Sequence, residues 1–292
     1  MLNYRKRQTI VNLATKLIII IAAVVVACPF LIMLFTAFKS DAEIARGMVS
    51  ILPEQLMWSN FISAMQLTDW PQYFLNTIII TLFSVLCSLV INSLAGYAFA
   101  RLRFRFKTIL FYCAMIGMML PMQVIMLPIF LQIKEFPLFG GNDIFGKGGI
   151  GLINQYAGVI LPLIAHPFGV FLFRNFYIGF PKELDEAAKI DGCSSLQTYL
   201  RLYIPMGKPI FATLCLLKTV DSWNQYTWPL LVFNDPAKRT VQLALNLFKG
   251  ETIVQWNYLM AATIIIILPV LALFVFLQKY FVQGTITTGM KD

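Results

Sequence analysis

Six long apolar runs dominate the chain and constrain its fold more than any other feature. A helix that crosses the hydrocarbon core of a bilayer needs about 20 consecutive, mostly apolar residues. The runs that meet this requirement are Leu17–Phe38, Tyr73–Ala100, Ile109–Ile133, Ala157–Ile178, Ile210–Phe233 and Tyr258–Val282. The pattern predicts an all-α, polytopic membrane protein with six transmembrane helices in a domain over residues 17–282. The first run could be a signal peptide, but it is long for one and lacks a small-x-small cleavage site.

The composition agrees with a membrane class of protein. Of 292 residues, 59% are hydrophobic and 13% are charged, whereas soluble domains carry roughly 25% charged residues. A soluble chain could not cover so much apolar surface with so few polar groups. The net charge of +9 does not indicate a nucleic-acid partner, because no segment combines a basic face with interleaved aromatic residues.

Lys and Arg residues are distributed unequally between the two sides of the predicted membrane domain. Fifteen fall on the side of the termini: Arg5, Lys6, Arg7, Lys16, Arg101, Arg103, Arg105, Lys107, Arg174, Lys182, Lys189, Arg201, Lys208, Lys279 and Lys291. Seven fall on the other side: Lys39, Arg46, Lys134, Lys147, Lys238, Arg239 and Lys249. Because the richer side of such a protein faces the cytoplasm, we expect a cytoplasmic arm at 1–16, a cytoplasmic tail at 283–292 and both termini inside.

Several of the apolar runs are interrupted by proline, which indicates more than a simple anchor. The prolines are Pro121, Pro128, Pro162, Pro167, Pro229 and Pro269. Proline frees backbone carbonyl groups and kinks a helix, and in lipid those groups must find partners in protein or water. Interrupted spans that also carry Asn, Ser and Gln favour a transport pathway.

Residues for catalysis or metal binding are scarce. The cysteines are Cys28, Cys87, Cys113, Cys193 and Cys215. They form no CxxC pair, and the single His166 is interpreted as a satisfied group inside a helix bundle. Residues 141–147 imitate the start of a phosphate-binding loop, but Gly148 replaces the required Ser or Thr, and the GxGxxG over 146–151 follows no strand. We therefore expect no catalytic residue, no metal and no cofactor on this chain.

The loop over residues 181–209 is the longest on the cytoplasmic side and predicts two short helices with a sharp joint. Pro181 can open the first helix, and Asp191-Gly192 can end it with a left-handed glycine. Ser194 and Gln197 form the pattern of a capping box for the second helix. Pro205 is expected to stop that helix. Taken alone, these local signals are equally typical of an ordinary cytoplasmic linker helix.

The spacing of residues in this loop resembles the EAA loop of ABC importer permeases. Glu186-Ala187-Ala188 is followed after three residues by Gly192 and, nine residues later, by Leu202, Ile204 and Pro205. The family pattern is EAA-x3-G-x9-I-x-LP, so both aliphatic positions differ conservatively. Further segments resemble the second permease subunit of maltose-type carbohydrate importers: 160–181, 222–233, 261–262, 268–269, 278–281 and 284–291. Departures are a longer glycine-rich loop at 140–151 and the presence of Lys218.

The resemblance implies a transport subunit of the bacterial inner membrane that is not an enzyme. It would pair with a homologous permease subunit and two ABC ATPase subunits, which bind ATP and Mg, and receive sugar from an extracytoplasmic binding protein facing loops 39–72 and 234–257. The amphipathic segment 241–256 could contact that binding protein. Coupling to the ATPases would fall on Glu186, Ala187, Ala188, Asp191, Gly192 and Pro205.

Two other classes stay open: a permease of another ABC importer class, and a membrane enzyme. The enzyme would need an ionisable cluster drawn from Lys218, Asp221, His166 and Arg174. Co-purification of ATPase subunits separates a permease from an enzyme.

The fifth run carries the candidate substrate-pathway residues Lys218, Asp221, Trp223, Asn224 and Gln225. A charge at the bilayer centre costs roughly 2.5–3.5 kcal/mol, so it usually has a partner or lines a wet cavity. Lys218 and Asp221 are three residues apart and can form a structural ion pair. Alternatively, Lys218 faces the pathway and attracts an acidic, uronic oligosaccharide.

Overall fold

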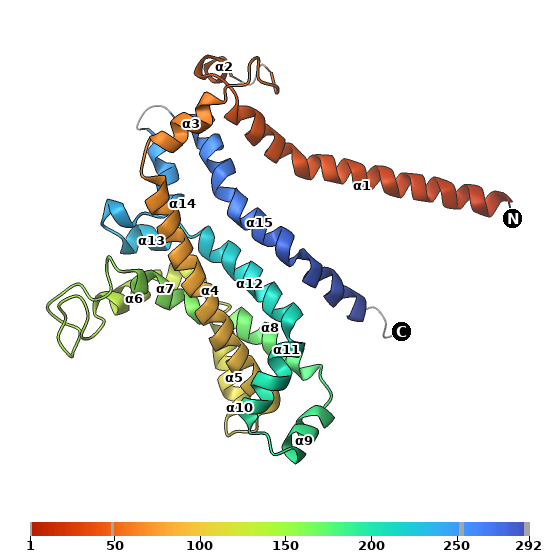
Figure 1. Ribbon diagram of the computed structural model, residues 1–292, viewed down its shortest axis with the longest axis vertical. Coiled ribbons are helices and arrows are strands. Elements are labelled where there is room, and N and C mark those ends of the chain that lie inside the picture. Colours follow the sequence, from red (N-terminus) through yellow and green to blue (C-terminus); the bar gives the residue numbers. More distant parts are fainter. Residues whose placement is uncertain (1, 48–49, 251–253, 289–292) are drawn as a thin grey trace. The chain divides into compact units, whose positions relative to one another are not determined.

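The computed structural model describes residues 2–47, 50–250 and 254–288 (Figure 1). Within those ranges the regular secondary structure is helical, apart from an isolated bridge between Lys249 and Val254, and turns and loops connect the helices. The residues form two compact units: Met1–Asp69 with Leu245–Leu268, and Trp70–Ala244 with Pro269–Asp292.

The smaller unit contains the long first helix. Its elements are α1 (Leu2–Ala37), α2 (Asp41–Ala45), α3 (Ser59–Gln66), η3 (Leu245–Phe248) and the first part of α15 (Trp256–Thr288). The arm expected at 1–16 and the first predicted span form one continuous helix from Leu2 onward. The apolar part, Val11–Ala37, has a mean hydropathy of 3.2.

Hydrogen bonds fix the chain directly after α1. Asn60 donates to the carbonyl oxygens of Ala37 and Lys39, at 2.9 Å each. Ser40 and Glu43 form a capping box at the start of α2, and a Glu43 oxygen also accepts from the N–H of Glu54 at 2.6 Å. These backbone donors lower the pKa of Glu43, because they stabilise its carboxylate.

The larger unit holds most of the helices. They are α4 (Trp70–Arg101), α5 (Lys107–Ile116), α6 (Met122–Lys134), α7 (Tyr156–Ile164), α8 (Pro167–Ile178), α9 (Glu183–Ile190), α10 (Ser195–Thr198), η1 (Tyr199–Tyr203), α11 (Ile204–Met206), α12 (Lys208–Trp223), α13 (Thr227–Val232), η2 (Pro236–Lys238), α14 (Val241–Ala244) and the end of α15.

Small residues let α4 and α8 approach closely at the centre of this unit. A Cβ atom added to Gly96 would lie 2.4 Å from the Cβ atom of Phe173, and one added to Gly169 would lie 3.0 Å from the side chain of Asn92. Close backbone approach through small residues is a common way to pack helices in lipid, where van der Waals contact drives association. The closely packed helices α4 and α8 therefore form the centre of this unit, against which several of its other helices pack.

The polar residues of α4 serve the break between α7 and α8. The Asn92 oxygen accepts from the N–H of His166 at 3.2 Å, and the Asn92 amide donates to the carbonyl of Ile164 at 3.4 Å. The same amide donates to Ser88 at 2.6 Å. Asn92 thus replaces backbone hydrogen bonds that the break removes, as an apolar environment requires.

Four helical segments are long and apolar enough to cross a membrane among the residues described: Val11–Ala37, Trp70–Arg101, Tyr156–Ile178 and Trp256–Tyr280. A fifth is possible if Ser195–Met206 and Lys208–Trp223, which meet at 78°, count as one span. The membrane-spanning all-α fold is confirmed, whereas the count of six spans stays a prediction.

The third and fifth predicted spans are not single helices. Ile109–Ile133 divides into α5 and α6, with 10 and 13 residues, and at about 1.5 Å per residue neither crosses a ~30 Å core alone. In 210–233, α12 ends at Trp223 and α13 starts at Thr227. The reason for the second break is Pro229, which has no N–H to donate to the carbonyl of Gln225.

Candidate functional site

Helix α9 presents Glu186-Ala187-Ala188, the start of the motif in the loop over 181–209, on an exposed surface. None of its residues is buried, and Glu183, Asp185 and Glu186 lie in its first turn, where the helix dipole favours negative charge. Helix α9 begins at Glu183, two residues later than the prediction that Pro181 opens it. Glu186 and Ala187 are exposed, and Ala188 is half-buried. This surface is available to another protein.

Gly192 makes the joint after α9. Asp191 is the C-terminal cap of the helix, and Gly192 has a φ of +74°, a conformation that glycine adopts without steric cost. The N–H of Cys193 donates to the carbonyl of Ala188 at 2.9 Å, which closes the end of the helix. The prediction of a left-handed glycine is confirmed.

The second helix of the loop begins as predicted and ends later. Ser194 and Gln197 form the capping box. Pro205, expected to stop the helix, lies inside α11, and the chain bends only after Met206. The π-helical turn η1 precedes it. Because the hydrogen-bond register changes at η1, the helix tolerates the missing N–H of Pro205. The prediction that Pro205 stops the helix is therefore wrong.

Arg101, the last residue of α4, contacts the start of α9 and the residues that lead into it. Its Nε donates to an Asp185 oxygen at 2.7 Å, and its two terminal nitrogens donate to the carbonyls of Phe180 and Pro181, at 3.0 and 2.7 Å. Tyr203 of η1 donates to the other Asp185 oxygen at 2.8 Å. Sequence reasoning missed this set, since Arg101 and Asp185 are 84 residues apart.

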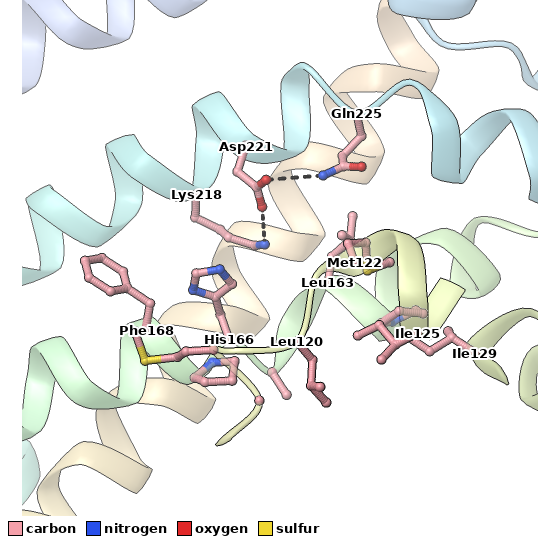
Figure 2. Close-up of a pocket in the computed structure, with 15 residues that line it drawn as sticks. Leu120, Met122, Ile125, Ile129, Leu163, His166, Phe168, Lys218, Asp221 and Gln225 are labelled. Carbon is pink, nitrogen blue, oxygen red and sulfur yellow. Dashed lines mark hydrogen bonds and ion pairs between the residues drawn. The ribbon is translucent and has the colours of Figure 1, made fainter. Parts of the chain in front are cut away.

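A second site is a cavity of about 370 Å³ beside α12 (Figure 2). Its polar lining consists of His166, Lys218, Asp221 and Gln225, and its apolar lining includes Met122, Ile125, Ile129, Leu163 and Phe168. Three of the five predicted pathway residues therefore meet at one cavity. Such a mixture of apolar walls and a few convergent polar groups is typical of small-molecule sites.

The Lys218–Asp221 ion pair predicted from the sequence is present. The Lys218 Nζ lies 2.6 Å from an Asp221 oxygen, and the Lys218 side chain is 2% exposed whereas that of Asp221 is 43% exposed. Gln225 donates to the other Asp221 oxygen at 3.2 Å. The pair is electrically balanced, and Asp221 is its more accessible member.

The other two predicted pathway residues do not line this cavity. The ring of Trp223 is buried against Phe74 of α4, with ring centroids 6.4 Å apart. Asn224 caps α12 and accepts from Gln242 at 3.0 Å.

His166 differs from its interpretation as a satisfied group inside a helix bundle. It is the residue before α8, at the break, and its buried Nδ1 atom has no hydrogen-bond partner in the structure. Figure 2 shows its ring beside the amino group of Lys218. A lone histidine in an apolar run gave no signal of this arrangement.

Arg174, assigned to the loop after the fourth span, lies within α8, where its guanidinium stacks over the ring of Phe111 at 4.1 Å. It does not line the cavity with Lys218, Asp221 and His166. Of the four ionisable residues named for a membrane enzyme, three therefore share the cavity and Arg174 lies apart from it.

The glycine-rich loop that imitates a phosphate-binding sequence has a different geometry. Asn142 donates to the carbonyls of Lys134 and Phe136, at 2.8 and 3.0 Å, and accepts from the N–H of Gly149 at 2.7 Å. Asp143 accepts from the N–H groups of Phe145 and Lys147. These backbone donors, which would hold a phosphate in a P-loop, bond to the loop's own side chains.

Hydrogen bonds attach the first residue of segment 241–256, and the residues just before it, to α4. Val241 donates its N–H to Thr77 at 3.0 Å, and Asn76 donates to the carbonyls of Ala237 and Arg239, at 2.8 Å each. Residues 48–49, 251–253 and 289–292, which belong to the predicted outer loops and tail, lie outside the described residues.

Comparison with protein families gives one match that covers most of the chain. Residues 89–287 match the family described as binding-protein-dependent transport system inner membrane component.

Two curated relatives align over nearly their whole length. The chain is 29% identical over 294 residues to the arabinooligosaccharides transport system permease protein AraQ of Bacillus subtilis, with 100% of both chains covered. It is 30% identical over 292 residues to the sn-glycerol-3-phosphate transport system permease protein UgpE of Rhizobium meliloti, with 97% of this chain and 99% of that one covered.

A solved structure has the same fold. It is a bacterial ABC transporter involved in the import of the acidic polysaccharide alginate, and one of its chains aligns with a TM-score of 0.78 at 23% identity. The alignment covers 93% of this chain and 96% of that chain.

Proposed function

We propose that this chain forms half of a sugar pathway and couples that pathway to ATPase subunits. The premise is that the chain belongs to the binding-protein-dependent transport inner membrane components and is a permease component of a carbohydrate ABC importer. Such permeases are multi-pass membrane proteins, are not enzymes, and work with an ATPase and a substrate-binding protein. The second half of the pathway is a homologous permease subunit.

The observation that carries the coupling role is the exposed helix α9. It has no buried residue, and it is held at a sharp joint by Gly192. One ATPase subunit docks on Glu186, Ala187 and Ala188, while Asp191, Gly192 and Pro205 shape the loop behind them. A second ATPase subunit docks on the partner permease, and the two ATPases bind ATP and Mg.

The mechanism is a change of conformation without chemistry on this chain. Closure of the ATPases moves α9, and the helices above it change from an inward-open to an outward-open arrangement. The binding protein delivers sugar at the other face, where 39–72 and 234–257 lie. Arm 1–16 precedes the membrane domain 17–282 in the sequence and tail 283–292 follows it, and both are cytoplasmic.

The substrate is an oligosaccharide that passes the cavity at Lys218, Asp221 and Gln225. Because the Lys218–Asp221 pair is balanced and exposes a carboxylate, hydroxyl groups of a sugar can donate to Asp221. An acidic, uronic oligosaccharide is the second candidate, favoured by Lys218 and by the names of two relatives, which concern sn-glycerol-3-phosphate and alginate. Trp223 and Asn224 do not line the cavity but support its wall. Trp223 does so through its contact with Phe74 of α4, and Asn224 through its hydrogen bond with Gln242 of segment 241–256.

The test of the function is assembly and uptake. The chain is co-expressed with the permease, ATPase and binding-protein genes beside it, purified and reconstituted into vesicles loaded with ATP. Uptake is measured for arabinotriose, maltotriose, an alginate trisaccharide and sn-glycerol-3-phosphate. We expect ATPase subunits to co-purify and a neutral trisaccharide to be taken up. Absence of ATPase subunits contradicts the function, and uptake of the alginate trisaccharide alone selects the acidic candidate.

Orientation has its own test. Arg103→Cys, Phe145→Cys, Ser195→Cys and Leu245→Cys are placed one at a time in a cysteine-free background and exposed to an impermeant maleimide in intact cells. Phe145→Cys, at an exposed position of the glycine-rich loop, and Leu245→Cys should react. Reaction of Ser195→Cys in sealed cells contradicts both the orientation and the coupling role.

A further inference from the structure

Three side chains from three helices meet beneath the exposed helix α9. Arg101 comes from α4, Asp185 from α9 and Tyr203 from η1, and we name them the clamp. Each Asp185 oxygen accepts one side-chain hydrogen bond, from Arg101 at 2.7 Å and from Tyr203 at 2.8 Å. The carboxylate of Asp185 is thereby held from two directions.

Arg101 is committed to this contact through its whole guanidinium group. Its side chain is 6% exposed. Its Nη1 donates to the carbonyl of Phe180, and its Nη2, which also lies 2.7 Å from an Asp185 oxygen, donates to the carbonyl of Pro181. Phe180 and Pro181 precede Lys182, the N-terminal cap of α9. A planar, pre-organised donor fork loses little entropy for each bond it forms, so Arg101 fixes both the entry to α9 and its first turn.

Tyr203 completes the contact from a dense aromatic cluster. Its ring is fully buried and lies near the rings of Tyr97, Tyr177 and Phe180, at centroid distances of 4.9, 5.2 and 5.6 Å. Burial raises the pKa of the Tyr203 hydroxyl, which therefore stays protonated and donates to Asp185. One turn earlier, Tyr199 shares a 2.6 Å hydrogen bond with Ser93 of α4.

We infer that the clamp makes α9 and the end of α4 move as one body. Without it, a helix that has no buried residue would be attached only by its two flanking turns, and a push on its exposed face would rotate it in place. With it, the displacement passes from Asp185 to Arg101, along α4, and to α8 through the close approach at Gly96 and Phe173. Arg101 and Tyr203 are thus positioning residues.

This inference rests on the proposed coupling function, and its test separates the two. Arg101→Ala and Tyr203→Phe are compared with Arg103→Ala, an exposed arginine two residues away, in the reconstituted importer. The readout is uptake per ATP hydrolysed, for whichever of the four substrates above is transported. We expect at least a tenfold fall for Arg101→Ala, a smaller fall for Tyr203→Phe, and no change for Arg103→Ala, with ATPase subunits bound in all three.

Loss of ATPase subunits from the Arg101 or Tyr203 variants would overturn the inference, because the contact would then shape the docking surface. Unchanged uptake per ATP in both variants would also overturn it. Tyr203→Phe keeps the aromatic packing and so decides the matter if Arg101→Ala does not fold.

A distance measurement tests the rigid link without any sugar. Spin labels on Arg103→Cys and Lys189→Cys report the separation of the α4 end from α9 in the complete importer. We expect one narrow distance that stays the same on addition of ATP and vanadate, and a broad or shifted distance in Tyr203→Phe. A wild-type distance that changes with ATP contradicts a rigid link.

Discussion

The loop around Gly192 and the cavity around Lys218 differ in how their geometry is determined. In the loop, each special residue acts on its near neighbours: Gly192 ends α9, and Ser194 caps the next helix with Gln197. In the cavity, His166 and Lys218 come from helices far apart in the sequence and meet only when the larger unit is packed. Substitutions at Gly192 and Ser194 should therefore affect docking and leave the packing of the helices intact, whereas substitutions in the cavity should affect packing as well.

The largest expected effect is that of Gly192→Val. A β-branched residue at a φ of +74° costs about 2 kcal/mol, since its Cβ meets the following carbonyl. Beyond the two adjoining residues, no atom lies within 4 Å of a Cβ at this position, so the fold should persist while the joint changes. We expect membrane insertion at the normal level, weak co-purification of ATPase subunits and uptake below about a tenth of normal.

Gly47→Val is the matched control, because Gly47 has a φ of +80° and equally open surroundings in the segment expected outside. Equal loss of ATPase subunits in both variants would show that backbone strain in general, and not the joint after α9, is responsible.

An intermediate effect is expected in the cavity, and it is asymmetric. Asp221→Asn leaves the buried Lys218 cation without its counter-charge, which should cost about 3 kcal/mol. Lys218→Met leaves Asp221, which is 43% exposed, so water can solvate the carboxylate and the cost should be about 1 kcal/mol. The thermal stability of the purified complex measures both costs.

The double variant Lys218→Met with Asp221→Asn should recover most of the stability lost in Asp221→Asn. Equal costs for the two single variants would contradict the assignment of Lys218 as the buried partner. A stable Lys218→Met variant that loses only alginate trisaccharide uptake would favour the acidic substrate.

The smallest effect is that of Ser194→Ala. Loss of one N-terminal cap costs about 1 kcal/mol, which corresponds to roughly a fivefold change in an equilibrium constant. We expect a modest weakening of ATPase binding, measured by titration of the purified ATPase subunit. Ser195→Ala, one residue further into the helix, should have no effect; equal weakening by both variants would show that the cap is not the cause.

The membrane class, the loop joint and the ion pair could be predicted from the sequence because their signals are local. Hydropathy, a glycine after a helix and two charges three residues apart each act within a few residues. The interruption of the third span was also a local signal, since the break at 117–121 ends at Pro121, whereas Pro128 lies inside α6. The position of Pro205 within α11 depends on alternatives that local pattern does not rank, such as a π-helical turn that absorbs a missing donor.

Tertiary contacts account for what the sequence could not indicate. Arg101 was one of four basic residues in a turn, and nothing nearby in the sequence marked it as the partner of Asp185. The sequence predicts a satisfied His166, but only its backbone N–H bonds to Asn92; its buried Nδ1 has no hydrogen-bond partner, and the residue lines a cavity beside α12. Each assignment requires knowing which helices are neighbours.

Contact between α9 and an ATPase subunit is the central claim, and site-specific photo-crosslinking tests it most directly. Ile190, on α9, is 87% exposed, and Phe145, in the glycine-rich loop, is 77% exposed. A photoreactive phenylalanine analogue at Ile190 should crosslink to the ATPase subunit in membranes, and the same analogue at Phe145 should not. An ATPase crosslink from Phe145, or none from Ile190 in an importer that hydrolyses ATP, would contradict the coupling role of this loop.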